Sequence, residues 1–360
     1  MQTQVLDAGG RIPAPVTLFE QKVAALTRNG GMARAHAKLM RKQALSLQEK
    51  IALSMELIRD WYESWNGLVS VSFSGGKDSS VLLWLVRSMY PDVPAVFCNT
   101  GLEYPEVVRL VLATRNHVVL KPAMPFFEVI RRFGWPIASK QIARGIDILR
   151  HPTDRNQNVR RLYAKGINRF GRPVQGYKVP LQWRFLLDAP FSVSDECCNV
   201  MKKKPGDKYE QETGRKPFVG TLASDSKARQ RTYLQRGCNA YDMERPRSAP
   251  LSFWTEQDIL QCIFENNIPV PSVYGDIRRD EDGQFITTGV RRTGCVFCCF
   301  GLHLDEGSLN RFELLANSHP RMHRLVMERL GLGEVIDYCR NHAPARLGKT
   351  FRCGERAEGD

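Results

Sequence analysis

Residues 70–80 read SVSFSGGKDSS and constrain the fold of this chain more than any other stretch. The residues before the glycines, 68–73, place β-branched and aromatic side chains at short spacing, as a buried strand does. Residues 79–89 are apolar at helical spacing and contain no Gly or Pro. The glycines therefore lie at a strand-to-helix turn, where the backbone can approach a ligand and the unpaired N–H groups of the first helical turn attract an anion.

The polar side chains of this turn predict that the anion is a phosphate. Lys77 adds a cation, and Ser74, Ser79 and Ser80 add hydroxyl donors. An ordinary glycine-containing turn seldom needs these groups together. The spacing also differs from that of the G-x-x-x-x-G-K-[ST] phosphate loop, so we expect a phosphate site of another kind.

The composition is that of a globular protein with a basic surface. The 360 residues are 42% hydrophobic and 25% charged, with a formal net charge of +14. No apolar run approaches the length of a membrane span, and residues 1–16 lack the basic and apolar regions of a signal peptide. We therefore expect a cytoplasmic protein with no membrane partner, whose ten cysteines are thiols, metal ligands or catalytic groups rather than disulfides.

Positive charge is concentrated between residues 151 and 184, where eight Lys or Arg residues accompany one acid, Asp154. Cations and stacking side chains together are typical of a surface for DNA or another nucleic acid, although a basic insertion without fixed structure has the same composition. The basic residues are Arg155, Arg160, Arg161, Lys165, Arg169, Arg172, Lys178 and Arg184, and the aromatic ones are Tyr163, Phe170, Tyr177 and Trp183.

Short apolar runs alternate with helical patterns along the chain. This alternation predicts right-handed βαβ units, and so an α/β fold with a doubly wound, mostly parallel sheet and a ligand at the carboxyl ends of its strands. We expect strands at 95–100, 118–122 and 217–224, helices within 17–65, 252–268 and 309–339, and no structure in 1–15 or after 343. We expect three parts: an N-terminal tail and helical region (1–66), a catalytic domain (67–301) and a C-terminal helical region and tail (302–360).

Five cysteines fall in two short basic segments, DECCNVMKKKP and RRTGCVFCCFGLH. In the second segment, the Cys-x-x-Cys spacing of Cys295 and Cys298 lets both sulfurs face one metal or cluster. The adjacent pair Cys197 and Cys198 is awkward in a tetrahedral zinc site, so the pattern favours an iron–sulfur cluster over zinc. Cations that would stabilise thiolates flank both segments: Lys202, Lys203, Lys204, Arg291 and Arg292.

The motif SGGKDSS resembles the PP-loop S-G-G-x-D-S of the ATP pyrophosphatase superfamily, which holds the β,γ-pyrophosphate of ATP in an adenine nucleotide alpha-hydrolase-like fold. The two cysteine pairs, separated by residues 199–294, resemble the [4Fe-4S] pattern of the adenylylsulfate reductases. Three further stretches resemble motifs of the phosphoadenylylsulfate (PAPS) reductase superfamily, although Thr221 and Leu222 replace the neighbourhood of one motif's first Arg. The stretches are CNTGLEYPEV, VGTLASDSKARQ and APLSFWTEQDILQCIFENNIPVPSVY, and over about residues 69–301 the chain is identified as a member of that superfamily.

Sulfonucleotide reductases generally lack a complete PP-loop because their substrate carries no β or γ phosphate, whereas this chain keeps it. A complete loop joined to reductase-like cysteines resembles the sulfurtransferases of bacterial DNA phosphorothioation (the DndC and SspD type) and prophage relatives. The resemblance implies an ATP pyrophosphatase that uses ATP, Mg²⁺ and a [4Fe-4S] cluster. It would adenylate an acceptor such as a DNA phosphate, and sulfur supplied by a cysteine desulfurase would then displace AMP.

The resemblance also implies roles for individual residues. Those for pyrophosphate are Ser72, Ser74, Gly75, Gly76, Lys77, Asp78 and Ser79; those for the nucleotide and its phosphate chain are Thr100, Gly101, Glu103, Asp225, Ser226 and Arg229. The cluster ligands are Cys197, Cys198, Cys295 and Cys298. The catalytic groups are Lys77, Asp78, Arg229 and Cys299, the last as a sulfur carrier or substitute ligand.

Two other functions remain open. The sequence FRCGER around Cys353 resembles the reductase tail E-C-G-[IL]-H, whose cysteine attacks the sulfonucleotide, and CFGLH also contains Gly-Leu-His. The chain is then an APS/PAPS reductase that releases sulfite. Alternatively, the chain is a co-regulator that binds a nucleotide and DNA without turnover.

Overall fold

The structure, a computed structural model, describes residues 31–305 and 308–354. In this part of the chain a six-stranded sheet has the order β3-β2-β1-β5-β7-β6. β6 pairs antiparallel with β7, and the other neighbours pair in parallel, which confirms the predicted α/β fold with a mostly parallel sheet. The strands are β1 Val69–Ser72, β2 Ala95–Cys98, β3 His117–Leu120, β5 Lys216–Val219, β6 Asn239–Ala240 and β7 Arg247–Ser248. Two small pairs lie outside the sheet: β4 Ile137–Ala138 with β10 Cys299–Phe300, and β8 Ile277–Arg279 with β9 Phe285–Thr287.

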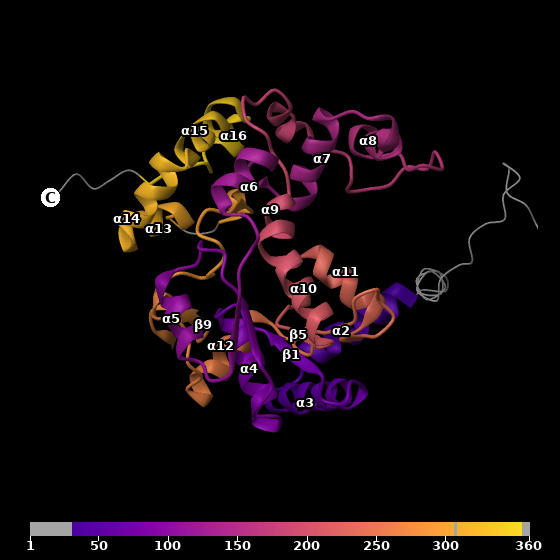
Figure 1. Cartoon of the computed structure of the whole chain (residues 1–360), viewed down its shortest axis with the longest axis vertical. Helices are drawn as coiled ribbons and strands as arrows, with labels where there is room; N and C mark the ends of the chain where they lie inside the picture. Colours follow the sequence, from indigo (N-terminus) through magenta and orange to yellow (C-terminus); the bar gives the residue numbers. More distant parts are fainter. Residues whose placement is uncertain (1–30, 306–307, 355–360) are drawn as a thin grey trace, which may run out of the picture.

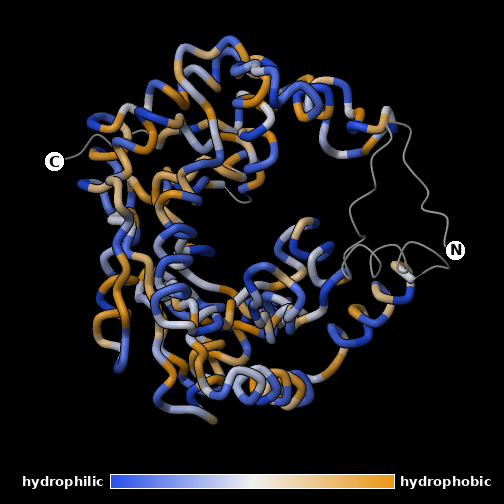
Figure 2. The backbone as a smooth tube through the Cα atoms, turned by 45° about the vertical axis from the view of Figure 1, so that its right-hand side comes forward, coloured by the Kyte–Doolittle hydropathy of each residue, from blue (hydrophilic) through white to orange (hydrophobic). Residues whose placement is uncertain are grey.

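The helices fall into two halves of the molecule. One half holds the sheet with α2 Gly31–Gln43, α3 Leu47–Ser64, α4 Lys77–Met89, α5 Pro105–Ala113, α10 Lys204–Thr213, α11 Lys227–Arg236 and α12 Glu256–Asn266 (Figure 1). The other holds α6 Phe126–Phe133, α7 Lys140–Arg150, α8 Gln157–Lys165, α9 Glu196–Cys198, α13 Arg311–Ser318, α14 Pro320–Arg324, α15 Leu332–His342 and α16 Ala345–Gly348. The backbones of the halves are joined along one side and stand apart on the other (Figure 2).

One hydrophobic core runs through both halves. It includes the strands around β1, with Val69 and Val71 fully buried, and the helix after β1, with Val81 and Leu82 fully buried. It continues to the C-terminal segment at Phe351. Because β1 is a central strand with neighbours on both sides, its carboxyl end is fixed in place for the turn that follows.

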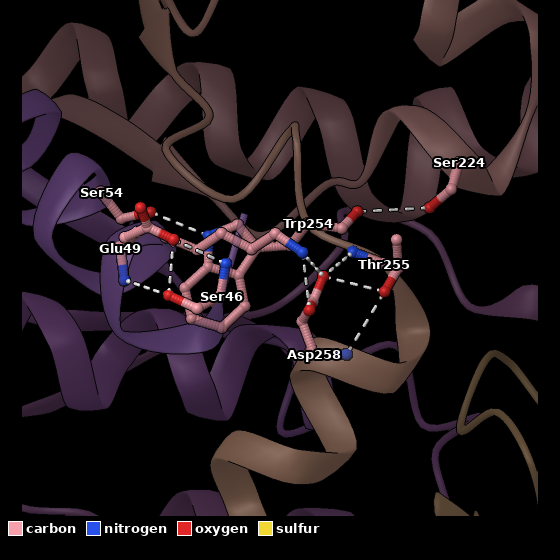
Figure 3. Close-up of polar contacts among 8 residues, drawn as sticks. Ser46, Glu49, Ser54, Ser224, Trp254, Thr255 and Asp258 are labelled. Carbon is pink, nitrogen blue, oxygen red and sulfur yellow. Dashed lines mark hydrogen bonds and ion pairs between the residues drawn. The ribbon is translucent and has the colours of Figure 1, made fainter. Parts of the chain in front are cut away.

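A polar link fastens α12 to α3, and so positions the start of α12 (Figure 3). Lys50 of α3 donates to both carboxylate oxygens of Asp258, at 2.7 and 2.8 Å, and both residues are buried. Asp258 also accepts from the backbone N–H and the hydroxyl of Thr255, the N-cap of α12, at 2.7 and 2.8 Å. Beside this link, Trp254 Nε1 donates to Ser54 Oγ at 2.9 Å. The first turn of α12 is thus held against a helix more than 200 residues away in sequence.

The predicted strands at 95–100, 118–122 and 217–224 are present, but each is only four residues long. The C-terminal expectation is wrong: α16 follows residue 343, and Phe351 is buried with its carbonyl accepting from Arg340 Nε at 2.8 Å. The expectation failed because Phe351 packs into the hydrophobic core, which composition alone does not reveal. The expectations for residues 1–30 lie outside the described residues. None of the helices described has both the length and the hydropathy needed to cross a membrane.

Candidate active site

Three loops meet at the carboxyl ends of neighbouring strands: the turn after β1, residues 99–103 after β2, and residues 220–225 after β5. The turn after β1 leads into α4 as the sequence predicted. Gly75 has φ +71°, and a Cβ atom there would lie 2.8 Å from Val107 Cγ1, so only glycine fits. Gly76 is the N-cap of α4 and has no side chain to bond the first N–H groups. The turn therefore presents helical N–H groups to a ligand.

Protein groups already contact the cationic part of this turn. The backbone N–H of Lys77 donates to the hydroxyl of Tyr274 at 3.1 Å. The buried Lys77 ammonium is paired with the carboxylate of Glu256, at the start of α12, and donates to the Arg291 carbonyl at 3.0 Å. Although burial opposes it, the hydrogen bond and charge of Lys77 lower the pKa of Glu256. An entering phosphate has to exchange with the hydroxyl of Tyr274 and compete with the carboxylate of Glu256.

Asp78 has a buried carboxylate oxygen, Oδ1, without a hydrogen-bond partner, and the hydroxyl of Ser80 nearby also lacks one. Burial, with a smaller contribution from the charge of Asp225, raises the pKa of Asp78 from 3.8 to about 6. A buried carboxylate oxygen without a donor beside a phosphate site has the chemistry of a Mg²⁺ ligand, so this residue fits the metal that the resemblance implies.

The loop after β5 contributes a carboxylate, Asp225, that binds two arginines from other segments. Arg229 forms an ion pair with Asp225, and Arg292 lies 3.1 Å from the same side chain. Ser226 is the N-cap of α11 and accepts from the backbone N–H of Arg229 at 3.2 Å. Asp225 also acts electrostatically on Asp78, so this loop adjoins the turn. Both guanidinium groups are more than one third exposed and can reach a phosphate chain after leaving the carboxylate.

The loop after β2 is organised by one buried acid. Glu103 accepts from the Thr100 hydroxyl at 2.7 Å and from the backbone N–H groups of Thr100 and Leu102 at 3.1 and 3.2 Å. Gly101 has φ +75° and is exposed. Glu103 thus shapes the loop, and Gly101 is the member of this set that faces solvent.

Four of the predicted cysteines meet. Cys197, Cys198, Cys295 and Cys298 line one pocket, together with Leu102, Phe126, Pro136, Met201, Lys202 and Phe297. The thiols of Cys197 and Cys198 hydrogen-bond each other, which lowers the pKa of Cys198, with help from the charges of Lys140 and Lys202. Burial raises the pKa of Cys298 to about 11. The expectation that distant cysteine pairs come together is therefore realised in the structure.

The fit of this pocket to a metal depends on which group is considered. Among the described residues, no three His, Cys, Asp or Glu side chains converge on the position of a single metal ion. A zinc ion needs four ligands at about 2.0–2.3 Å, so a closed zinc site is not formed. Four cysteines in an apolar pocket with two nearby lysines match an iron–sulfur cluster in donor chemistry.

The remaining charged and sulfur residues lie elsewhere than the sequence suggested. Arg291 and Arg292 face Glu256 and Asp225 of the phosphate site rather than the sulfurs. Cys299 is buried in β10, does not line the pocket, and its pKa is raised well above the usual value by burial. A thiol held in its protonated form is a poor nucleophile, which weighs against the predicted sulfur carrier.

One short segment joins the phosphate turn to the cysteine pocket. We define residues 290–298 as the strap. The Thr293 hydroxyl lies 2.8 Å from that of Tyr274, and a Cβ atom on Gly76 would lie 3.1 Å from it. Cys295 follows two residues later and lines the pocket. Two residues of extended chain span at most about 7 Å, so the two sites are neighbours.

The basic segment 151–184 is folded. Ile167 and Pro173 form a β-bridge, and α8 packs against α7. Tyr163 and Trp183 are buried, and Tyr177 packs partly against the core, so these three aromatics do not offer stacking faces. Phe170 is 70% exposed, with the Arg169 guanidinium 4.7 Å above its ring. The aromatic part of the predicted nucleic-acid surface reduces to this residue.

Sequence reasoning missed three residues of the phosphate site: Glu256, Tyr274 and Thr293. Glu256 stands in the stretch FWTEQD that carried the family resemblance, so its position near the site could have been inferred. Tyr274 ends the longer stretch APLSFWTEQDILQCIFENNIPVPSVY and Thr293 lies in the cysteine segment RRTGCVFCCFGLH, but neither stretch indicated a contact with the turn. They reach the turn only because η5, Ser272–Tyr274, and the strap fold over it.

The fold and the site together define a class: an α/β protein with a glycine turn that presents helical N–H groups after a central strand, and a thiol pocket beside it. A sequence profile of the phosphoadenosine phosphosulfate reductase domain matches residues 68–137 and 150–299, more than half of the chain. The chain therefore belongs to this family.

Individual relatives are more distant. Over 315 residues the chain is 26% identical to sulfate adenylyltransferase subunit 2 of Shewanella baltica, covering 78% of this chain and 92% of that one. Over 105 residues it is 33% identical to an uncharacterised protein of Methanocaldococcus jannaschii, covering 27% of this chain and 25% of the relative. The chain thus spans about a quarter of that relative's length. A solved PAPS reductase from Candida auris, in a phosphate complex, is 16% identical with a TM-score of 0.35, covering 71% of this chain and 97% of that one.

Proposed function

We propose that this protein is an ATP pyrophosphatase that adenylates an acceptor for sulfur transfer, with DNA phosphorothioate modification as its role. The observation that supports this most is the complete SGGKDSS turn with the buried ammonium of Lys77 and the unpartnered oxygen of Asp78. A sulfonucleotide needs neither, because it has no β or γ phosphate. The similarity to a sulfate adenylyltransferase subunit is in keeping with adenylyl transfer.

The proposed reaction has two steps. An acceptor oxygen attacks the α-phosphorus of ATP, the bond between that phosphorus and the α–β bridging oxygen breaks, and Mg²⁺-pyrophosphate leaves. The terminal sulfur of a persulfide on a partner, such as a cysteine desulfurase, then attacks the adenylated acceptor and AMP leaves. A thiol reduces the resulting S–S bond and so releases the thiolated acceptor. The chain is also proposed to bind the acceptor DNA through segment 151–184.

Residues of the turn stabilise the leaving pyrophosphate in this scheme. The N–H groups of the first turn of α4, the Lys77 ammonium and the hydroxyls of Ser74 and Ser79 donate to phosphate oxygens. Asp78 would hold Mg²⁺ through its unpartnered oxygen. Arg229 and Arg292 exchange Asp225 for the phosphate chain as charge develops on it.

The cysteine pocket supplies the sulfur side of the proposal. Cys197, Cys198, Cys295 and Cys298 would hold a [4Fe-4S] cluster, which supplies redox or sulfide-binding chemistry when present. Lys202 lies against these sulfurs and also 3.9 Å from Glu103, so it neutralises negative charge between pocket and nucleotide loop. Anaerobic purification followed by iron and sulfide analysis tests this part, and full occupancy by zinc would overturn it.

Formation of AMP and pyrophosphate from ATP, with and without DNA, tests the proposed activity. We expect both products from the wild type and a loss of at least about 100-fold in Lys77→Ala, because a phosphate clamp contributes to transition-state binding. Lys208→Ala is the matched control, since this exposed lysine pairs with Glu212 at 3.6 Å on α10, away from the turn. If the wild type forms no product above background, the proposed enzyme activity is wrong, and the nucleotide-binding co-regulator is the remaining hypothesis.

The family membership keeps a sulfonucleotide reductase as the second candidate. Its cysteine would be Cys353, which is half-buried with Arg340 Nη2 3.6 Å from its sulfur. This candidate predicts thiol-dependent sulfite release from adenylylsulfate. A protein with iron and sulfide bound that fails this assay is not a reductase.

A further inference from the structure

Helices α2 and α11 pack against each other and carry an unusual concentration of positive charge. Neither helix contains an acidic residue. Since like charges repel, these helices need opposite charge from other parts of the molecule or from a partner, and Arg229 and Arg236 receive it from Asp225 and Asp242. Their basic residues are Arg34, Lys38, Arg41 and Lys42 on α2, and Lys227, Arg229, Arg231 and Arg236 on α11.

Four of these cations are open to a partner. Lys38, Arg41, Lys227 and Arg231 are exposed, and among the described residues none of them has an acidic partner. Lys38 and Arg41 are three residues apart on α2, and Lys227 and Arg231 are four apart on α11, so each pair shares a helix face. α11 contributes no fully buried residue, and although Tyr233 and Leu234 pack partly against the core, that packing does not explain its exposed cations.

We infer that α2 and α11 form a docking surface, here named the basic wall, for the phosphate backbone of a nucleic acid. The wall is defined by Lys38, Arg41, Lys227 and Arg231. These four residues are long, flexible cations, so the wall suits phosphates rather than bases, and binding is independent of sequence. Its neighbour Arg229, on α11, pairs with Asp225 beside the phosphate turn, so a bound backbone lies close to the nucleotide site.

The position of the wall agrees with this assignment. α2 and α11 lie in one half of the molecule and α8 in the other, all on the side where the halves stand apart (Figures 1 and 2). Segment 151–184 and the two helices of the wall therefore border the same side. The inference deepens the proposed function by naming a second surface that binds the acceptor. The choice of a nucleic acid over another polyanion rests on that proposed function.

Equilibrium binding of fluorescein-labelled 24-base-pair DNA of two unrelated sequences, without nucleotide, tests the wall. We expect Lys38→Gln/Arg41→Gln and Lys227→Gln/Arg231→Gln each to weaken binding to both duplexes by roughly tenfold at about 0.15 M salt. The slope of log K against log salt should fall by up to about 1.8, from two lost contacts at about 0.9 each. Gln keeps the helices intact, and thermal melting verifies this.

Arg109→Gln/Arg115→Gln is the matched control. These two arginines are exposed and belong to α5 and its end, away from the wall. Binding that is unchanged in both wall variants, or reduced equally in the control, overturns the inference, as does a wild type that binds poly-glutamate or anionic vesicles but no DNA. Because ATP is absent, these results are independent of pyrophosphate release, which alone decides the proposed enzyme activity.

Discussion

Asp78 is a carboxylate whose titration reports on its surroundings. Burial and Asp225 raise its pKa to about 6, so the folded protein retains a proton that the unfolded chain has released between about pH 4 and 6. Folding therefore becomes less favourable as pH rises through this window. We expect Asp78→Asn to gain stability relative to the wild type, on the order of 2 kcal/mol, between pH 4 and 7. Urea unfolding without Mg²⁺ at the two pH values measures the difference.

Asp92→Asn provides the comparison for that measurement, because the Asp92 side chain is 88% exposed. Its stability relative to the wild type should change little over the same range. If Asp78→Asn also keeps a constant difference from the wild type, Asp78 is ionised in the folded protein throughout, and the desolvation described for it is absent.

Tyr274 occupies a backbone donor that the phosphate site needs. We expect Tyr274→Phe to bind Mg²⁺-pyrophosphate roughly fivefold more tightly, because the anion no longer displaces a hydrogen bond worth about 1 kcal/mol. Isothermal titration calorimetry measures the affinity. Tyr62→Phe is the control, since Tyr62 stacks on Tyr90 at 3.6 Å between ring centroids and has no contact with the turn. Weaker binding in Tyr274→Phe would mean that the hydroxyl contacts the phosphate instead.

A single site residue can be predicted from sequence when local interactions position it, and not when contacts with distant parts of the chain do. Lys77 and Gly75 were identified from sequence because a strand, a turn and a helix in succession fix them locally. Tyr274 could not be identified, because its contact with Lys77 joins residues 197 positions apart and depends on the folding of a loop. The site roles assigned to the turn remain predictions.

At the scale of elements, the Lys50–Asp258 pair holds α12 to α3. Removing one partner leaves an uncompensated charge in the interior, so we expect Lys50→Met to lower the free energy of unfolding by about 3 to 5 kcal/mol. Lys208→Met breaks an exposed pair and should cost less than about 1 kcal/mol. Urea denaturation compares them. Equal small losses would show that Asp258 is satisfied by Thr255 and solvent without the lysine.

Elements with a local signature were predicted well. α12 begins at a Thr-x-x-Asp capping box and ends at an Asn with φ +49°, before Pro269, as its sequence indicates. The mostly parallel sheet followed from the alternation of strands and helices. The burial of Tyr163 and Trp183 could not be predicted from the sequence. Aromatic residues in a basic stretch can pack in a core or stack on a ligand, and only tertiary packing decides which. α16 was missed for the same reason.

At the scale of the molecule, the resemblance anticipated both the meeting of the two cysteine pairs and the grouping of residues after β1, β2 and β5 in one candidate site. The path that joins these sites was not predictable. The strap has no secondary structure before β10, and its course depends on contacts such as Val296 N to Leu102 O at 2.9 Å.

Because the strap contacts both the phosphate turn and the cysteine pocket, we expect ligand binding at one site to affect the other. Thr293 and Cys295 are only two residues apart, so we expect pyrophosphate bound at Gly76 to shift the backbone that carries the thiols. In iron-free protein, we expect Mg²⁺-pyrophosphate to change the iodoacetamide labelling rates of Cys295 and Cys298, followed by mass spectrometry, while Cys262 in α12 keeps its rate. By thermodynamic reciprocity, blocking these thiols then alters the affinity for pyrophosphate. Nucleotide binding and sulfur chemistry would then be coupled. Identical labelling with and without the ligand would mean that the two chemistries run unsynchronised.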